Sequence, residues 1–449
     1  SASQQGGSEA PKTTASPASK ETAEPVTLRW MFFAPGKQKD SEEVWAEFNK
    51  RLADVLPNTT VEFIPVTGAE YVDKWKLAMA SGEEIDIAWA GYLQDVLSEI
   101  NNGAYYELDD LLKQYAPGIL EELPAWVMEY ATVNGKIYGV PNYQVAFDMR
   151  LGLRVPTEFI DKGYIDPEEA QNIFYQYGPN SEEAYDVIER YLEKLKQNGE
   201  LRKGPSTVSM TFPPHMSGAN IGSPFYLQGT WTDAKSIRVV NIFETEVMKR
   251  MYDKAADWFK KGYIRQDILS VQMPRQDEGK PDGYVTWIHT IVGDQSQSDT
   301  TRYGFPITVI PMEENYKITA PIYGTFSAIP KTSKHPERAM QLLELMHTVK
   351  GKDLYNLLVW GIEGKHYTKT GENRIETIGY AGQGTADSPY GLYKWVMGNT
   401  ANAYETQADP EGYTELWQRL NDQAIKSAVL AFKPNPDPVK TEISEPVRG

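Results

Sequence analysis

Apolar strands and amphipathic helices alternate along the first hundred residues. Strands are predicted at Val26–Phe33, Thr60–Val66 and Ile85–Trp89, where apolar and β-branched residues form short runs. Between them, the segments 40–56 and 71–82 place apolar side chains at helical spacing. This β-α-β-α-β order predicts a parallel sheet covered by helices, which is the architecture of an α/β fold.

The same alternation returns later in the chain. Helical spacing marks the segment 248–262, and strands are expected at Gly283–His289 and Ile322–Ile329. A helix is predicted to begin at Pro336, and the region from Tyr390 to Phe432 is expected to be mostly helical. The pattern therefore favours two α/β lobes.

The first 25 residues differ from the rest. They contain no Val, Ile, Leu, Met or aromatic residue. Such a segment cannot bury enough apolar surface to offset the entropy lost on ordering, so residues 1–25 are expected to be a disordered tether. A polar tether ahead of a folded body resembles the start of a bacterial lipoprotein after its lipidated Cys. A disordered terminus without that role fits the tail equally well.

Composition narrows the classes of function. The chain has 449 residues, which is enough for two or three domains. Its net charge of −17 would repel phosphate backbones, so we expect no nucleic-acid partner. There are no cysteines, which excludes disulfides and thiolate chemistry. The 27 Tyr and 11 Trp residues are the first positive indication of function, because aromatic rings bind large amphipathic ligands well.

Local motifs for catalysis and cofactors are absent from the sequence. It contains no GxGxxG, GxxxxGK[ST], GxSxG or HExxH string. None of the five histidines has a second histidine four residues away on a helix, so a His-based zinc site has no local support. We expect no metal among the site residues and no cofactor, and the sequence does not tell whether a structural metal is bound. A carboxylate pair for glycoside hydrolysis stays open, because such pairs meet in space and not in sequence.

Four strings, in a specific order, resemble extracellular solute-binding proteins of bacterial ABC importers, and the expected type is the carbohydrate-binding one. They are Asn134–Pro141 (NGKIYGVP), Tyr323–Pro330 (YGTFSAIP), Asn356–Tyr367 (NLLVWGIEGKHY) and Trp395–Asn399 (WVMGN). The last two resemble a lipoprotein subgroup that carries a DUF3502 domain. The resemblance covers roughly residues 26–440, but the stretch from Phe212 to Trp231 matches no motif of the family.

The resemblance implies a two-lobed, class II periplasmic-binding-protein-like fold that closes on its ligand about a hinge. It implies a first lobe of residues 26–142 plus 321–366 and a second lobe of 143–320 plus 367–449, the latter with a helical C-terminal part. The chain would cross between the lobes near Asn142, Pro321 and His366. The implied protein is not an enzyme. It is a monomer outside the cytoplasm, anchored to the cell membrane by a lipidated Cys upstream of residue 1, and it delivers an oligosaccharide to permease subunits.

Ligand contacts are expected from aromatic and amide side chains at strand ends and crossovers, because rings pack on sugar faces while amides bind hydroxyl groups. The resemblance marks Trp287 as a sugar platform. Trp89 and Trp395 could equally be core residues, residues 142–144 an ordinary turn, and His289 a structural residue. The expected ligand-binding residues are Trp89, Tyr92, Asn142, Tyr143, Gln144, Trp231, Trp287, His289, Tyr323, Trp395 and Asn399. Four other tryptophans lie on amphipathic helices and are assigned to packing: Trp45, Trp75, Trp258 and Trp417.

Two other classes of function stay open. A glycoside hydrolase or lyase would show the same richness in aromatic residues, and it would release products. An importer receptor for a peptide or another small solute would have a cleft without a stacked aromatic platform. The sugar, its linkage and its length do not follow from the sequence.

Overall fold

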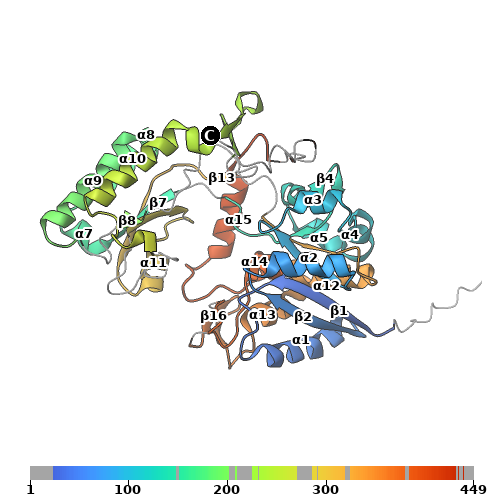
Figure 1. Ribbon diagram of the computed structural model, residues 1–449. Helices are drawn as coiled ribbons and strands as arrows, with labels where there is room; N and C mark the ends of the chain where they lie inside the picture. Colours follow the sequence, from blue (N-terminus) through green and yellow to red (C-terminus); the bar gives the residue numbers. More distant parts are fainter. Residues whose placement is uncertain are drawn as a thin grey trace, which may run out of the picture.

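Two α/β lobes lie side by side in the structure, a computed structural model (Figure 1). It describes residues 24–147, 151–201, 208–209, 225–230, 232–270, 286–290, 292–318, 324–379, 384–430, 433 and 438. For residues 208–209, 225–227, 286–290 and 302 it describes the backbone only.

The sheet of the first lobe has five strands in the order β2-β1-β3-β14-β6. Strand β1 is parallel to β2 and β3, while β14 is antiparallel to β3 and to β6. The predicted β-α-β-α-β unit is therefore present, with the third strand extending two residues beyond Trp89. The strands are β1 (Val26–Phe33), β2 (Thr59–Val66), β3 (Ile87–Gly91), β6 (Val140–Pro141) and β14 (Thr325–Ala328).

Helices of the first lobe bury their apolar sides in one hydrophobic core with this sheet. Trp45 on α1 and Trp75 on α2 are buried, which confirms their assignment to packing. A small hairpin, β4 (Thr132–Val133) and β5 (Lys136–Ile137), turns at Asn134 and Gly135, whose φ angles are 51° and 75°. The helices are α1 (Ser41–Val55), α2 (Tyr71–Ser81), α3 (Val96–Asn101), α4 (Asp109–Tyr115), α5 (Pro117–Glu122), α6 (Ala125–Met128), α12 (Pro336–His347) and α13 (Lys352–Trp360).

The string at 356–367 has a structural role in this lobe. His366 is buried, and its Nδ1 accepts a hydrogen bond from the backbone N–H of Ile362 at 2.9 Å. Its Nε2 lies 3.1 Å from Oδ2 of Asp40, the residue before α1. The imidazole thus joins the turn after α13 to the start of α1.

The second lobe is built on a four-stranded sheet in the order β12-β7-β11-β8. Strands β11 and β12 are antiparallel to β7, and β8 is parallel to β11. Its elements are β7 (Leu151–Pro156), α7 (Thr157–Asp161), α8 (Pro167–Tyr177), α9 (Glu182–Gln197), β8 (Val208–Ser209), β9 (Phe225–Gln228), β10 (Arg238–Asn241), α10 (Glu246–Lys260), β11 (Thr286–Thr290), α11 (Ser296–Tyr303) and β12 (Ile307–Pro311).

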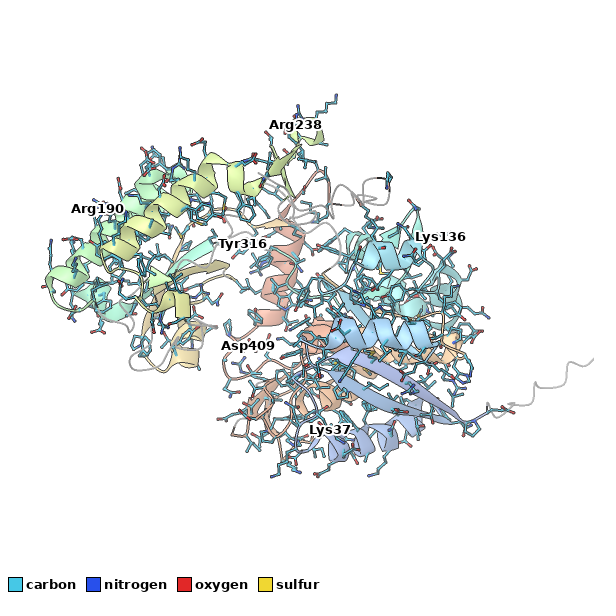
Figure 2. The ribbon with its side chains drawn as sticks, in the orientation of Figure 1. Lys37, Lys136, Arg190, Arg238, Tyr316 and Asp409 are labelled. Atoms are coloured by element: carbon cyan, nitrogen blue, oxygen red, sulfur yellow. The ribbon has the colours of Figure 1, made fainter. Side chains whose placement is uncertain are left out.

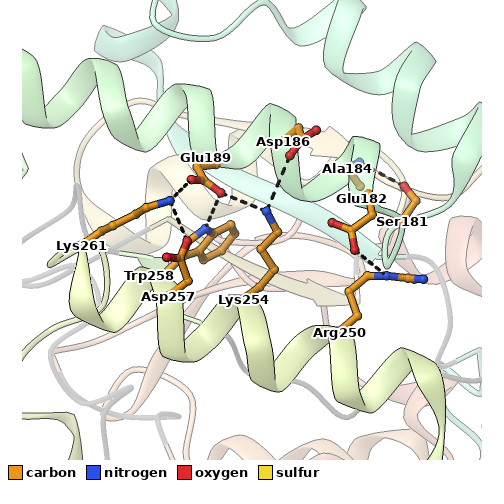
Figure 3. A network of polar contacts seen from close by, with 10 residues as sticks. All are labelled: Ser181, Glu182, Ala184, Asp186, Glu189, Arg250, Lys254, Asp257, Trp258 and Lys261. Atoms are coloured by element: carbon orange, nitrogen blue, oxygen red, sulfur yellow. Dashed lines mark hydrogen bonds and ion pairs between the residues drawn. The ribbon is translucent and has the colours of Figure 1, made fainter.

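Helices α9 and α10 are held together by a polar network centred on Glu189 (Figure 3). The Glu189 carboxylate accepts hydrogen bonds from Lys254 Nζ and from the indole of Trp258, both at 3.1 Å. Lys261 pairs with the other carboxylate oxygen. Burial acts to raise the pKa of Glu189, but these three donors outweigh it and lower the pKa to about 2. Trp258 is fully buried, as its assignment to packing predicted.

The C-terminal part packs against the first lobe, which corrects the expected assignment of residues 367–449 to the second. Tyr367, Ile375, Val396 and Trp417 all belong to the hydrophobic core of the first lobe. The region from Tyr390 to Phe432 is also less helical than expected: its described α-helices are α14 and α15, and loops connect them. The elements of the C-terminal part are β15 (Tyr367–Gly371), β16 (Arg374–Thr377), α14 (Lys394–Met397), a 3₁₀ turn at Thr400–Asn402, α15 (Tyr413–Gln423) and β17 (Ile425–Lys426).

Among the described residues, the chain passes from the first core to the second before β7 and returns to the first core after β12. Strand β13 (Lys317–Ile318) lies in this returning segment and pairs with β17 in parallel. Tyr316 is labelled in this central region (Figure 2), and its hydroxyl accepts a hydrogen bond from the N–H of Gly293 at 2.8 Å. Near His366 the chain stays in the first core, so the third crossover expected there is wrong. The other lobe boundaries stay predictions.

Candidate functional site

A cavity of about 330 Å³ opens at the edge of the first sheet where β3 ends. Ligands of open α/β sheets bind at this edge, beyond the carboxyl ends of parallel strands. Its walls come from the residue after β3, the end of β6 and the segment that follows it, the start of β14, helix α6 with the turn after it, and helix α14. The lining residues are Tyr92, Val127, Tyr130, Pro141, Asn142, Tyr143, Gln144, Val145, Ala146, Gly324, Thr325 and Trp395.

Two aromatic rings form one wall of the cavity. Tyr92, directly after β3, is 59% exposed, and Trp395 on α14 is half-buried. Their ring centroids are 6.3 Å apart with an interplanar angle of 37°. Tyr393 stacks on Trp395 at 5.5 Å and 17°. Partial burial and the neighbouring Tyr393 raise the pKa of Tyr92, so its phenol stays a protonated donor at neutral pH. This wall offers ring faces to a ligand.

Residues after β6 form the opposite, amide-bearing wall. Gln144 is half-buried and faces the cavity with Val145 and Ala146. Tyr143 is only 4% exposed, and its ring packs against Trp417 of α15 with centroids 5.0 Å apart. Burial raises the pKa of Tyr143 as well.

Asn142 lines the cavity, but its carboxamide is used within the protein. Its Nδ2 donates to Thr325 Oγ1 at 2.9 Å and to the carbonyl of Val396 at 3.0 Å. Its Oδ1 lies 3.0 Å from Nε2 of His347, an imidazole whose pKa burial lowers to about 4. The Asn142 side chain therefore holds the crossover in place, because its hydrogen-bonding groups are already used by other residues of the protein.

Asn421 of α15 is a site residue that sequence reasoning missed. Its Oδ1 accepts from the N–H of Ala146 at 2.8 Å, and its Nδ2 donates to the carbonyl of Gln144 at 2.8 Å. The side chain is fully buried. Asn421 thus holds the first and last residues of the wall segment 144–146. Asn421 and Gln144 are 277 positions apart in the sequence.

Trp89 lies beneath the cavity and does not line it. It is fully buried in β3, and its indole donates to Thr325 Oγ1 at 2.7 Å. A Cβ at Gly91 would lie 2.6 Å from the Trp89 ring and 2.7 Å from the carbonyl of Gly324. The absent side chain of Gly91 therefore makes room for the Trp89 ring and for the backbone before β14.

The remaining expected residues fall in three groups. Asn399 is buried away from the cavity, where its Nδ2 donates to the carbonyl of His347 at 3.1 Å. Trp287 and His289 lie on β11, opposite Arg154 and Gly152 of β7, but their side chains are outside the described part. Trp231 and Tyr323 lie outside the described residues altogether. The cavity thus brings together Tyr92, Asn142, Tyr143, Gln144 and Trp395.

A second cavity, of about 640 Å³, separates α11 of the second lobe from the β15–β16 hairpin. It is lined by polar side chains, and Arg374 within it already pairs with Glu405. Asp409, labelled in Figure 2, borders it. None of its described lining residues is aromatic, so the cavity beside Tyr92 is the stronger candidate for a binding site.

Within the described ranges, no group of three or more His, Cys, Asp or Glu side chains is placed to hold a metal ion. Among the same residues, no helix has the length and apolar character needed to span a membrane.

Sequence comparison finds similar transport proteins. The chain is 25% identical over 431 residues to a carbohydrate ABC transporter substrate-binding protein of Streptococcus pneumoniae serotype 4, covering 92% of this chain and 80% of that protein. It is 22% identical over 367 residues to the polygalacturonan/rhamnogalacturonan-binding protein YtcQ of Bacillus subtilis, covering 78% and 68%. No family model matches, so membership of the DUF3502-like subgroup stays a prediction.

Structural comparison confirms the expected two-lobed fold. The N-glycan transport solute-binding protein NgtS of Streptococcus pneumoniae superposes with a TM-score of 0.74 at 23% identity, covering 94% of this chain and 88% of that one. Complexes of NgtS with Man1GlcNAc and Man5GlcNAc superpose with TM-scores of 0.67 and 0.66. The chain therefore has the fold of a solute-binding protein.

Proposed function

We propose that this chain is a solute-binding protein that captures an oligosaccharide between its lobes and delivers it to an ABC importer. The observation that carries the proposal is the cavity walled by the exposed ring of Tyr92 and the half-buried ring of Trp395. Sugar rings present C–H faces that pack on aromatic rings, and amides such as Gln144 bind hydroxyl groups. Similarity to carbohydrate-binding transport proteins supports the same conclusion.

The chemistry of the lining favours a neutral glycan. Ring faces, aliphatic groups, phenols and amides make up most of the described lining, and they suit hydroxyl and acetamido groups. A net charge of −17 would repel uronate polymers, although YtcQ is a polygalacturonan/rhamnogalacturonan-binding protein. We therefore favour a neutral oligosaccharide of the N-glycan type, such as the Man5GlcNAc found in complex with NgtS.

Isothermal titration calorimetry with a ligand panel tests this proposal. The panel contains Man5GlcNAc, a maltooligosaccharide, an oligogalacturonide and a peptide of similar mass. Saturable binding of a neutral glycan is expected, and binding of the peptide alone would favour the alternative receptor function. Incubation of the same glycan followed by mass spectrometry tests the alternative of a hydrolase or lyase, because an enzyme would release shorter products.

Location and partners form part of the proposal. A protein with this role acts outside the cytoplasm, as a monomer, and contacts the permease subunits of its importer. Attachment to the membrane through a lipidated cysteine upstream of residue 1 stays a prediction. Crosslinking of the chain to the permease in membranes, with and without glycan, measures the partnership directly.

Ligand capture is proposed to close the lobes. A glycan held against Tyr92 would contact the second lobe as well, and contacts to both lobes favour the closed state. Small-angle scattering is expected to give a smaller radius of gyration at saturating glycan. Equal radii with and without bound glycan would indicate a rigid receptor with a preformed site.

A further inference from the structure

The hydroxyl of Thr325 joins three elements directly behind the aromatic wall of the cavity. It accepts hydrogen bonds from the indole of Trp89 at 2.7 Å and from Nδ2 of Asn142 at 2.9 Å. It donates to the backbone carbonyl of Trp395 at 3.1 Å. Thr325 is the first residue of β14, so the hydroxyl connects β14 to β3, to the crossover after β6 and to α14.

This hydroxyl has no capacity left for a ligand. A threonine hydroxyl has one proton to donate and two lone pairs that accept, and all three are used within the protein. Thr325 lines the cavity, yet its side chain is committed to neighbouring residues. Its contribution to binding must therefore act through the residues that it holds.

Helix α14 needs such support because it has only four residues, Lys394–Met397. A single turn is too short to be stable alone, and its last carbonyls have no partner within the helix. Three successive carbonyls of this helix each accept a side-chain hydrogen bond from another part of the lobe. Lys394 O accepts from Tyr355, Trp395 O from Thr325 and Val396 O from Asn142.

We propose that Thr325 is a positioning residue of the binding site, whose hydroxyl sets the orientation of Trp395 and of the crossover at Asn142. The inference rests on the proposed function for its effect on affinity, but the positioning itself does not need a ligand. A ring held in place before the glycan arrives loses less conformational entropy on binding, which raises affinity. Thr325 therefore tunes binding without touching the sugar through its hydroxyl.

The test compares Thr325→Val with Thr325→Ser. Valine keeps the shape but leaves two buried donors without an acceptor, whereas serine keeps the hydroxyl. The matched control is Thr332→Val. The Thr332 hydroxyl also forms hydrogen bonds within the first lobe, but its partners are the backbone N–H and carbonyl of Ile85 and not α14. The Kd for Man5GlcNAc is expected to rise about tenfold or more in Thr325→Val, and to stay within about threefold in the other two variants.

A ligand-free measurement separates this inference from the proposed function. In ¹⁵N-resolved NMR spectra, the indole signals of Trp89 and Trp395 are assigned from Trp→Phe variants. Thr325→Val is expected to shift both signals and to speed exchange of the Trp89 indole proton, while Thr325→Ser leaves them near their wild-type positions. If Thr325→Val does not fold, Thr325→Ala at low temperature replaces it with the same expectation.

Each outcome decides the inference. Unchanged indole signals in Thr325→Val, or an equal loss of affinity in Thr332→Val, overturn it. If no glycan of the panel binds the wild-type protein, the proposed function fails, while shifted indole signals still support the positioning role. Unchanged affinity in Thr325→Val with shifted signals overturns the claim that positioning affects binding.

Discussion

The guanidinium Nε of Arg154 lies 2.6 Å from Oδ2 of Asp299, and both side chains are only 3% exposed. Arg154 is on β7, inside the second sheet, and Asp299 is on α11. The pair therefore attaches α11 to the sheet through a desolvated ionic hydrogen bond. Replacing one partner of such a pair by a neutral residue removes the opposite charge next to a buried ion, which is destabilising.

Asp299→Asn is expected to lower the free energy of unfolding of the second lobe by about 3–5 kcal/mol, because the Arg154 charge stays buried. Urea denaturation followed by circular dichroism measures the change. Glu169→Gln is the control, since Glu169 pairs with Arg190 on the surface and should lose at most about 1 kcal/mol. Equal effects of the two substitutions would show that burial of the Arg154–Asp299 pair does not matter.

Tyr92→Ala and Trp395→Ala are each expected to weaken glycan binding by about 2–4 kcal/mol, which is roughly 30- to 1,000-fold in Kd. The physical reason is loss of the ring face that covers the sugar. Tyr177→Ala is the control, because Tyr177 on α8 is also a half-exposed ring but lies on the second lobe away from the cavity. Calorimetry measures all three variants, and retention of wild-type affinity in both cavity variants would remove the aromatic wall from the site.

Trp89→Ala is expected to act mainly on stability. Its indole is fully buried among aromatic rings, so truncation leaves a cavity and should cost about 3–5 kcal/mol. Thermal unfolding measures this loss. A Trp89→Ala protein with wild-type melting temperature and no glycan binding would instead assign Trp89 to ligand contact, as the sequence alone allowed.

Stability is expected to fall as pH drops, in part through Glu189. Its folded-state pKa of about 2 lies below the ordinary value of 4.5, so its stabilising effect is complete above about pH 4.5 and is lost as pH falls toward 2. Glu189→Gln removes this titration. Urea denaturation at pH 6 and pH 3 should therefore show a smaller difference in unfolding free energy for Glu189→Gln than for the wild type. An identical difference in both proteins would rule out a contribution from Glu189.

Periodicity predicted the first β-α-β-α-β unit, strand β14 and helix α12, because their buried faces follow the spacing of apolar residues. It did not predict the short elements α4, α5, α6 and β6. It could not show that β3 continues to Gly91, which moves Trp89 from a strand end into the strand. Aromatic rings near the cavity could be predicted from their type, as Tyr92 and Trp395 were. Thr325 and Asn421 could not, since a small polar residue gains its role from partners far away in sequence.

The C-terminal region was misplaced for a related reason. Apolar residues such as Trp417 and Leu420 have a helical spacing that indicates a buried face, but spacing does not say which core receives it. The resemblance at 356–367 suggested a crossover there, whereas His366 and Asp40 hold that turn within the first lobe.

The two cores differ in how their residues are distributed along the chain, and this sets the order in which they can form during synthesis. The second core draws its buried residues from the continuous stretch between Leu151 and Met312. The first core needs residues from Leu28 and from Ala424 together. On a ribosome, the inserted lobe can therefore complete its core while the outer lobe still waits for its last segment. Until Trp417 and Leu420 emerge, the core of the lobe that carries the binding site lacks part of its apolar residues, which exposes the nascent chain to aggregation and to chaperones.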